Sequence, residues 1–130
     1  MDIEVFTLCE AAADYQGRLN ILGIFDTIFS PNIPAAHPHC AIAIRLRFRK
    51  AEEGKHSLVI RIVDQDGKTT IWDLSGDFTI SFSENDFFGA INLVANLNDF
   101  TFNRYGEYNI NLVVDSQAVS TLPFRVKQSA

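Results

Sequence analysis

The chain has 130 residues, of which 47% are hydrophobic and 21% charged, and its formal net charge at pH 7 is −5. This size and composition predict one globular domain over residues 1–130 and exclude a disordered tail. The acidic balance argues against a nucleic-acid-binding protein, which needs a basic surface, and against docking on an anionic membrane.

The start of the chain has no basic segment ahead of an apolar one, and Glu4 and Glu10 interrupt its apolar residues. No apolar run approaches the roughly 18 residues of a membrane span. We therefore expect a soluble, cytoplasmic protein. The two cysteines, Cys9 and Cys40, lie in apolar runs, where we expect free, buried thiols.

The first segment, Ile3–Glu10, carries apolar residues on both faces when it is read as a strand. That pattern fits a strand buried on one face and partly covered on the other. A short helix through Leu8–Ala13 is the alternative, because alanine and glutamate favour helix. Asp14-Tyr15-Gln16-Gly17 predicts a turn in which Gly17 takes a positive φ.

The most apolar stretch is Arg18–Phe29. Its β-branched and aromatic residues favour a strand. Because both faces are apolar, this strand is either covered on two sides or changes sheets midway, with a bend at Gly23. Ser30–Pro38 holds three of the four prolines and predicts an irregular connection that crosses between sheets.

The segment His39–Arg49 shows the clearest period of two. Its even-numbered residues from Cys40 to Phe48 are apolar and predict a buried face. The opposite face, predicted to be wet as in antiparallel sheets, carries Ala41, Ala43, Arg45, Arg47 and Arg49.

The remaining strands follow at hairpin spacing. Asp64-Gln65-Asp66-Gly67 predicts a hairpin turn, and Ser75-Gly76-Asp77 predicts a break in the strand that contains Trp72. Asp115-Ser116-Gln117 predicts the turn of a closing hairpin. The whole pattern gives eight or nine strands with little helix. It predicts an all-β fold, an antiparallel two-sheet β-sandwich of Greek-key type, with a barrel as the alternative.

Two resemblances support this fold. Gly106-x-Tyr108 resembles the tyrosine corner of Greek-key sandwiches, which makes the chain immunoglobulin-like in architecture only, since both cysteines precede Trp72. Residues Gly17–Asp26, followed by Ile33–Pro38, resemble a family of small uncharacterised bacterial proteins, a domain of unknown function. That resemblance implies a bacterial single-domain sandwich and no particular activity.

Two clusters are candidates for metal binding. His37-Pro38-His39-Cys40 contains ligand types for zinc, but His39 and Cys40 point to opposite faces of a strand. Asp64–Gly67 resembles the start of a calcium loop but lacks the later ligands at fixed offsets. We expect no cofactor, and read these segments as a shaped loop and a hairpin turn.

A candidate partner or ligand surface comprises charged and aromatic residues. Arg45, Arg47 and Arg49 form a basic stripe on one face of their strand. We expect Arg61 beside this stripe, and Glu52, Glu53 and Asp64 as its ion-pair partners. Because adjacent residues on a strand point to opposite faces, one of Phe87 and Phe88 is a candidate for an exposed interface residue, with packing in the core as the favoured alternative. The full set of candidate residues is His37, His39, Arg45, Arg47, Arg49, Trp72, Phe87 and Phe88.

Nucleophile-elbow and phosphate-loop motifs are absent from the sequence. We therefore expect a protein that is not an enzyme: an interaction or structural module that binds an unknown protein or itself as a homodimer. The alternative is a small-ligand binder, for a carbohydrate or an anion. A hydrolase whose site is dispersed along the chain is the third hypothesis.

Overall fold

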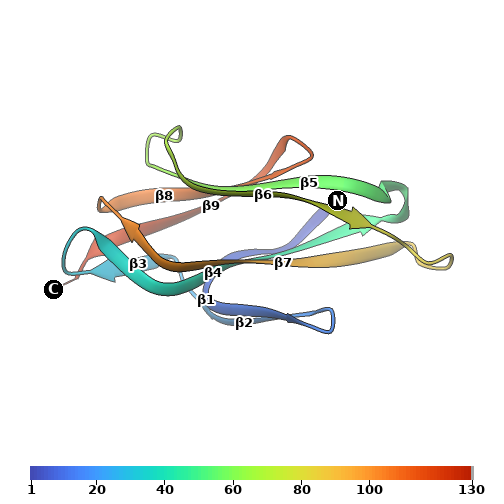
Figure 1. The fold of residues 1–130 in the computed structure, drawn as a ribbon, viewed down its shortest axis with the longest axis horizontal. Helices are drawn as coiled ribbons and strands as arrows, with labels where there is room; N and C mark the ends of the chain where they lie inside the picture. The colour runs from blue at the N-terminus through green and yellow to red at the C-terminus, as the bar shows by residue number, and fades with distance from the viewer. Residues whose placement is uncertain (130) are drawn as a thin grey trace.

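The computed structural model describes residues 1–129, which form nine β-strands and one short 3-10 turn (Figure 1). The strands are β1 (Asp2–Tyr15), β2 (Arg18–Ile24), β3 (Thr27–Ser30), β4 (Ala35–Arg49), β5 (Gly54–Val63), β6 (Thr70–Ile80), β7 (Phe88–Phe102), β8 (Gly106–Val114) and β9 (Gln117–Gln128); the turn is η1 (Lys50–Glu52).

The strands form two sheets that lie face to face, as Figure 1 shows. One sheet has the order β2-β1-β4-β7 and the other β3-β9-β8-β5-β6. The predicted all-β two-sheet sandwich is therefore confirmed, and the barrel alternative is wrong. The pairing is antiparallel except between β3 and β9, which run parallel.

The core lies between the sheets and follows the predicted period of two. Ile42, Ile44 and Leu46 of β4 are fully buried against the facing sheet. Burying each such side chain contributes roughly 1.5–3 kcal/mol to the free energy of folding. The facing sheet contributes Ile60, Ile62, Ile110, Leu112 and Val126.

The closing hairpin anchors one end of this core. The Tyr108 hydroxyl donates to the carbonyl of Arg104 at 2.8 Å, which confirms the predicted tyrosine corner. Its ring stacks on Phe124, with centroids 5.4 Å apart. Asp115 and Ser116 both have positive φ, as the two central residues of a type I′ hairpin turn do.

The β1–β2 hairpin adds a third layer to the sandwich. β1 pairs with β4 over Asp2–Cys9 and with β2 over Cys9–Tyr15. The second half of β1 and β2 then lie across the outer face of β4 and β7, at the bottom of Figure 1. The carbonyl of Gly17, at the hairpin tip, accepts a hydrogen bond from the side-chain amide of Asn92 at 3.1 Å.

This layer corrects the predicted wet face of His39–Arg49. Ala41 and Ala43 are not exposed at all, because the hairpin packs on them. A methyl side chain lets two backbones approach closely, so alanine suits a buried position between the sheet and the hairpin. The helix alternative for Leu8–Ala13 is also wrong, since that segment continues β1 as a strand.

The stretch Arg18–Phe29 changes sheets midway, which is the second of the two predicted alternatives. β2 belongs to one sheet and β3 to the other, and the chain crosses between them at Phe25 and Asp26. Gly23 has a φ of 67°, and a Cβ there would lie 2.8 Å from the Cγ of Glu10. Gly23 is therefore the bend, and both its backbone and its surroundings favour glycine.

Two strand boundaries differ from the prediction. No break occurs at Ser75–Asp77, because β6 runs unbroken along β5 with Gly76 opposite Leu58. The proline-rich connection is shorter than Ser30–Pro38, since β4 already begins at Ala35. Pairing with β7 keeps the chain extended through Pro38.

A larger side chain at Ala43 tests the packing of the hairpin on β4. We expect Ala43→Leu to lower the free energy of unfolding by about 1–3 kcal/mol, because the added atoms must displace the hairpin. Ala36→Leu is the matched control: Ala36 is exposed on the same strand, so the change should stay within about 0.5 kcal/mol. Urea unfolding measures both, and equal effects would contradict the third layer.

Candidate functional site

Large apolar side chains remain exposed at a few places on the described surface. Two of them, Phe87 and Phe88, are adjacent in sequence, and Leu74 lies on β6. The other five come from the β1–β2 hairpin and the crossing that follows it: Tyr15, Leu22, Ile24, Phe29 and Ile33. Of this second group, Ile24 and Phe29 line one cleft, and Leu22 lies two residues before Ile24 on β2.

We call Leu22, Ile24 and Phe29 the hairpin flank. All three are more than 60% exposed. Ile24 and Phe29 border a cleft of about 470 Å³ that opens between the two sheets. The cleft lies where β2 leads into β3, and it is lined by Thr7, Leu8, Ile24, Phe25, Asp26, Thr27, Phe29, Leu122 and Pro123.

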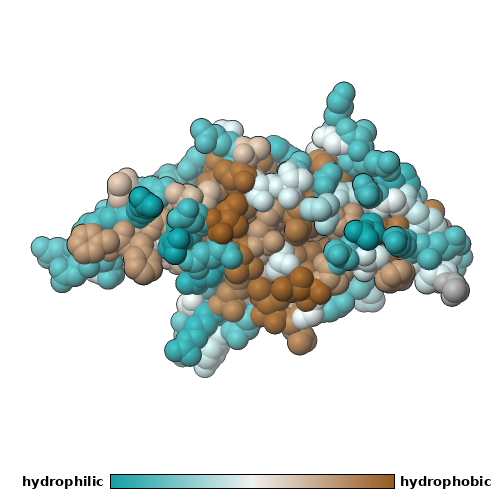
Figure 2. Space-filling view, turned by 180° about the vertical axis from the view of Figure 1, so that it is seen from behind, coloured by the Kyte–Doolittle hydropathy of each residue, from teal (hydrophilic) through white to brown (hydrophobic). Residues whose placement is uncertain are grey.

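A second hollow lies on the hairpin itself. It has a volume of about 250 Å³ and is lined by the three consecutive alanines Ala11–Ala13 and by Asn20, Ile21 and Leu22. Figure 2, the view from behind, shows hydrophobic residues gathered in a band that reaches the lower edge of the molecule, at the level of β2 in Figure 1.

The alternation of β2 explains why this surface is apolar. Leu19 and Ile21 point toward β4 and β7 and pack on the cluster of Cys9, Ala41 and Ala43. Leu22 therefore points away from that layer, and its side chain is 70% exposed. The sequence showed apolar residues on both faces of this strand, but only one face is used within the chain.

We call Arg47, Arg49, Phe87 and Phe88 the arginine end. Arg45, on the same face of β4, forms an ion pair with Glu4: its Nε donates to the Glu4 carboxylate at 2.7 Å. Arg47 lies 3.3 Å from the carboxylate of Asp2 and 3.4 Å from that of Glu4. The guanidinium of Arg49 has no carboxylate within 4.0 Å among residues 1–129, while the backbone N–H of Arg49 donates to the carboxylate of Glu52 at 2.9 Å.

The predicted surroundings of the arginine stripe are wrong. Arg61 lies on β5 in the other sheet, so it does not join the stripe. The ion-pair partners of Arg45 and Arg47 come from β1, not from Glu52, Glu53 or Asp64. The neighbour of β4 on this side is β1, and the sequence pattern could not specify that pairing.

Phe87 and Phe88 are both exposed, although one was expected to be buried. Phe88 is opposite Arg49 in the β4–β7 pairing. A hollow of about 220 Å³ at this end is lined by Asp2, Arg47, Arg49 and Phe88. The ammonium of Lys50 lies 6.0 Å from the centre of the Phe87 ring. The arrangement offers guanidinium donors beside an aromatic surface.

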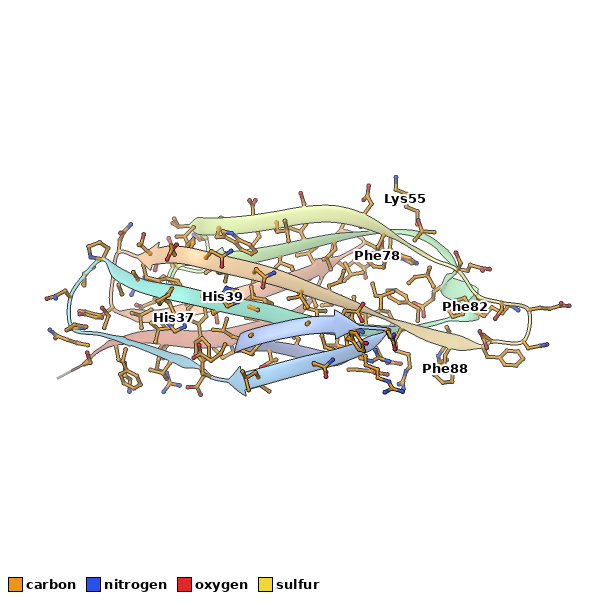
Figure 3. The ribbon with its side chains drawn as sticks, turned by 60° about the horizontal axis from the view of Figure 1, so that its bottom comes forward. His37, His39, Lys55, Phe78, Phe82 and Phe88 are labelled. Atoms are coloured by element: carbon orange, nitrogen blue, oxygen red, sulfur yellow. The ribbon has the colours of Figure 1, made fainter. Side chains whose placement is uncertain are left out.

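The other predicted residues lie elsewhere. His37 and His39 are far along β4 from Phe88 (Figure 3). His37 contacts Glu10 at 3.4 Å, and His39 contacts Asn98 at 2.7 Å. Trp72 is half-buried within β6, where it packs against the core instead of standing at a loop end. The structure thus joins Arg47 and Arg49 with Phe88 and separates them from the histidines and Trp72.

The candidate metal ligands are engaged in other contacts. Cys40 points into the core while His39 points outward, as predicted. The carboxylate of Asp66 accepts hydrogen bonds from the backbone of Lys68 and Thr69, and that of Asp64 pairs with Arg104. Within residues 1–129 no group of three or more His, Cys, Asp or Glu side chains is placed to hold a metal ion.

A polar cluster that the sequence did not reveal lies at one end of the five-stranded sheet, where β5 meets η1 and the β8–β9 turn. His56 Nδ1 lies 2.6 Å from the carboxylate of Asp115, and Nε2 lies 2.6 Å from the carbonyl of Glu52. The hydrogen bond to Asp115, followed by that to Glu52, raises the pKa of His56 above its ordinary value. The same contact lowers the pKa of Asp115. These residues are 59 positions apart in sequence, so no local pattern marks them.

The pH dependence of stability tests this cluster. Because the folded protein raises the pKa of His56, the imidazolium stabilises fully below the ordinary value of 6.5 and loses its effect as the pH rises through the raised value. We expect the wild-type protein to have a larger free energy of unfolding than the His56→Gln variant at about pH 6. The difference between the two should shrink by about pH 9. Urea unfolding across this range measures it; a constant difference would contradict the assignment.

The fold resembles parts of larger solved structures. A β-glucosidase from Listeria innocua in complex with isofagomine matches with a TM-score of 0.52 and 8% identity, over 95% of this chain and 16% of that chain. A glycosyl hydrolase family 2 member from Bacteroides cellulosilyticus DSM 14838 matches with a TM-score of 0.42 and 14% identity, over 71% and 13%. The present chain thus spans a small part of these proteins, and the likeness to the β-glucosidase concerns the fold alone.

No curated protein matches the chain. Among the described residues no helix is long and apolar enough to cross a membrane. The family of unknown function DUF6941, in contrast, matches residues 4–127, which is nearly the whole chain. The predicted resemblance to a domain of unknown function is confirmed: the protein belongs to the family DUF6941.

Proposed function

We propose that this protein is a non-catalytic interaction module that binds another protein chain through the hairpin flank. The observation that carries the proposal is the exposure of Ile24 and Phe29 at a cleft of about 470 Å³, with Leu22 exposed two residues before Ile24. Contiguous exposed apolar surface on a soluble domain marks interaction sites, whereas single exposed residues need no explanation.

The flank has the composition of an interface. Its centre is apolar, and its border carries Thr7, Asp26 and Thr27 along the cleft. Pro123 closes the side formed by β9. An apolar centre with a polar rim is the usual anatomy of a protein–protein contact, in which a buried aromatic residue supplies much of the binding free energy. Phe29 is the natural anchor.

The titratable groups favour a structural role over catalysis. The shifted pKa values of His56 and Asp115 arise from a contact that joins β5 to the β8–β9 turn. His37 and His39 each contact one polar neighbour and lie outside the cleft. We infer from these contacts that the module carries out no reaction of its own.

The free thiols of Cys9 and Cys40, with the family resemblance, support a bacterial cytoplasmic setting.

The arginine end supports a second candidate function, the binding of a small anion or carbohydrate. Arg49 offers a guanidinium that is free of side-chain carboxylates among the described residues, and Phe88 offers an exposed ring next to it. Guanidinium groups bind anions in a planar, bidentate manner, and aromatic faces stack on flat ligands. The hollow here is smaller than the cleft at the flank, which is why we place this function second.

Site-specific photocrosslinking tests the first proposal. A photoreactive amino acid replaces Ile24, and the protein is irradiated in an extract of its source organism. We expect discrete protein adducts, because position 24 borders the cleft. Adding Phe29→Asp should abolish them, whereas adding Phe88→Asp, a matched change at an equally exposed ring, should leave them intact.

Adducts that survive Phe29→Asp, or that are lost equally with Phe88→Asp, would contradict binding at the flank. If position 24 gives no protein adduct at all, the interaction proposal fails. The arginine end then becomes the site to examine, with a panel of anions and sugars.

A further inference from the structure

Another hollow lies at the end of the sandwich where β7 leads into β8, at the left of Figure 1. It has a volume of about 320 Å³ and is lined by Phe100–Arg104, Tyr108, Asp64 and Ile71. We call it the corner pocket, after the tyrosine corner. β6 and β7, which contribute to its walls, are the outermost strands on the side of the sandwich opposite to β2 and β3. The corner pocket is therefore separate from the cleft at the hairpin flank.

The inner part of the corner pocket is aromatic and rigid. Phe102 and Tyr108 are each 2% exposed, and their ring centroids lie 5.2 Å apart. Phe100 is half-buried and meets Phe102 edge to face, with centroids 4.9 Å apart. Ile71 of β6, also half-buried, packs against the same core. A ligand in the pocket thus contacts rings that the core already holds in place.

The one acid and the one base that line the pocket neutralise each other. Asp64 forms an ion pair with Arg104. The guanidinium also donates to the carbonyl of Tyr105 at 2.7 Å, to that of Glu107 at 3.1 Å and to the side chain of Gln65 at 3.1 Å. Four of its five N–H groups are therefore engaged. An anion would find few free donors here, and a cation would have to displace the guanidinium from Asp64. The pocket favours an uncharged ligand.

Three polar groups at the pocket have unused hydrogen-bonding capacity within residues 1–129. Both hydrogen bonds to the carboxylate of Asp64 reach Oδ1, which leaves Oδ2 as an acceptor. The hydroxyl of Thr101 and the amide of Asn103 belong to exposed residues, and neither bonds to another described residue. The carboxylate oxygen only accepts, whereas the hydroxyl and the amide both donate and accept.

An uncharged sugar ring matches this set of groups. Its hydroxyls can donate to a carboxylate oxygen and accept from an amide, while the C–H groups of its ring pack on an aromatic wall. A volume of about 320 Å³ lies near the lower end of the range of roughly 300–1,000 Å³ for ligand sites, which suits a single ring.

We propose that the corner pocket binds one ring of an uncharged saccharide. This site goes beyond the proposed function, because it shares no residue with the hairpin flank or its cleft. It also differs from the arginine end in the ligand it selects: the guanidinium of Arg49 is open to anions, whereas that of Arg104 is already paired.

Titration of the isotope-labelled protein, followed through its backbone amide chemical shifts, tests the site. The neutral probes are glucose, galactose, mannose and N-acetylglucosamine. We expect saturable shifts at Asp64, Thr101 and Asn103 with at least one of them, with a Kd on the order of 1 mM, as is usual for a ligand of about 12 non-hydrogen atoms. Glucuronate, glucosamine and inorganic phosphate are the charged probes and should bind more weakly.

Substitutions locate the binding. Asn103→Ala and Thr101→Val each remove one polar group from the pocket and should raise the Kd about two- to tenfold. Asn96→Ala is the matched control: Asn96 is likewise exposed, on β7 outside the pocket, and its loss should leave the Kd unchanged. The thermal midpoint of each variant confirms that it is folded.

Four results would overturn the proposal. The first is the absence of a saturable shift with all four neutral sugars up to about 50 mM. The second is tighter binding of a charged probe than of every neutral sugar. The third is a set of shifts that gathers at Arg49 and Phe88, which would assign the sugar to the arginine end. The fourth is wild-type affinity in both Asn103→Ala and Thr101→Val. None of these results bears on photocrosslinking at position 24, which tests the proposed function separately.

Discussion

The packing of the β1–β2 hairpin on Ala41 and Ala43 determines how the rest of the surface is used. It turns the outer face of β4 from a solvent-exposed surface into a second, smaller core that also buries Cys9. Since Leu19 and Ile21 pack in this smaller core, the alternation of β2 leaves the side chains of Leu22 and Ile24 exposed to solvent. The candidate interaction surface is thus a direct consequence of how the hairpin lies.

The outer face of β4 changes character along its length. Its first part carries His37 and His39, its middle the covered alanines, and its last part the arginines. Arg45 links the last two parts, because it contacts the hairpin tip through the carbonyl of Gly17 and pairs with Glu4. Most of the positive charge on this strand therefore holds β1 and the hairpin in place. Among the described residues, only the guanidinium of Arg49 on this strand has no carboxylate next to it.

Local patterns predicted the parts of the fold that local physics decides. The period of two identified the inner face of β4, and Gly23 identified the change of sheet, because a bend needs a residue that tolerates positive φ. Tyr108 was recognised because its hydrogen bond reaches only four residues back. Each of these features depends on neighbours along the chain.

Features that depend on distant parts of the chain were not predicted. The pattern of β4 showed that Ala41 and Ala43 face away from the core, but it contained no information on what covers them. The contact of His56 with Asp115 and the pairing of Arg45 with Glu4 join residues 59 and 41 positions apart. Phe87 and Phe88 are both exposed where β7 begins, although strand alternation would place them on opposite faces.

Amide hydrogen exchange at single residues of β2 tests the account most directly. Asn20 and Leu22 bond to β1, so their amides should exchange slowly. Leu19 and Ile21 direct their amides to the open edge of the sheet, so these amides should exchange fast although both side chains are packed on β4 and β7. Equal protection of all four amides would contradict a hairpin that lies on β4 and β7 with β2 as its outer strand.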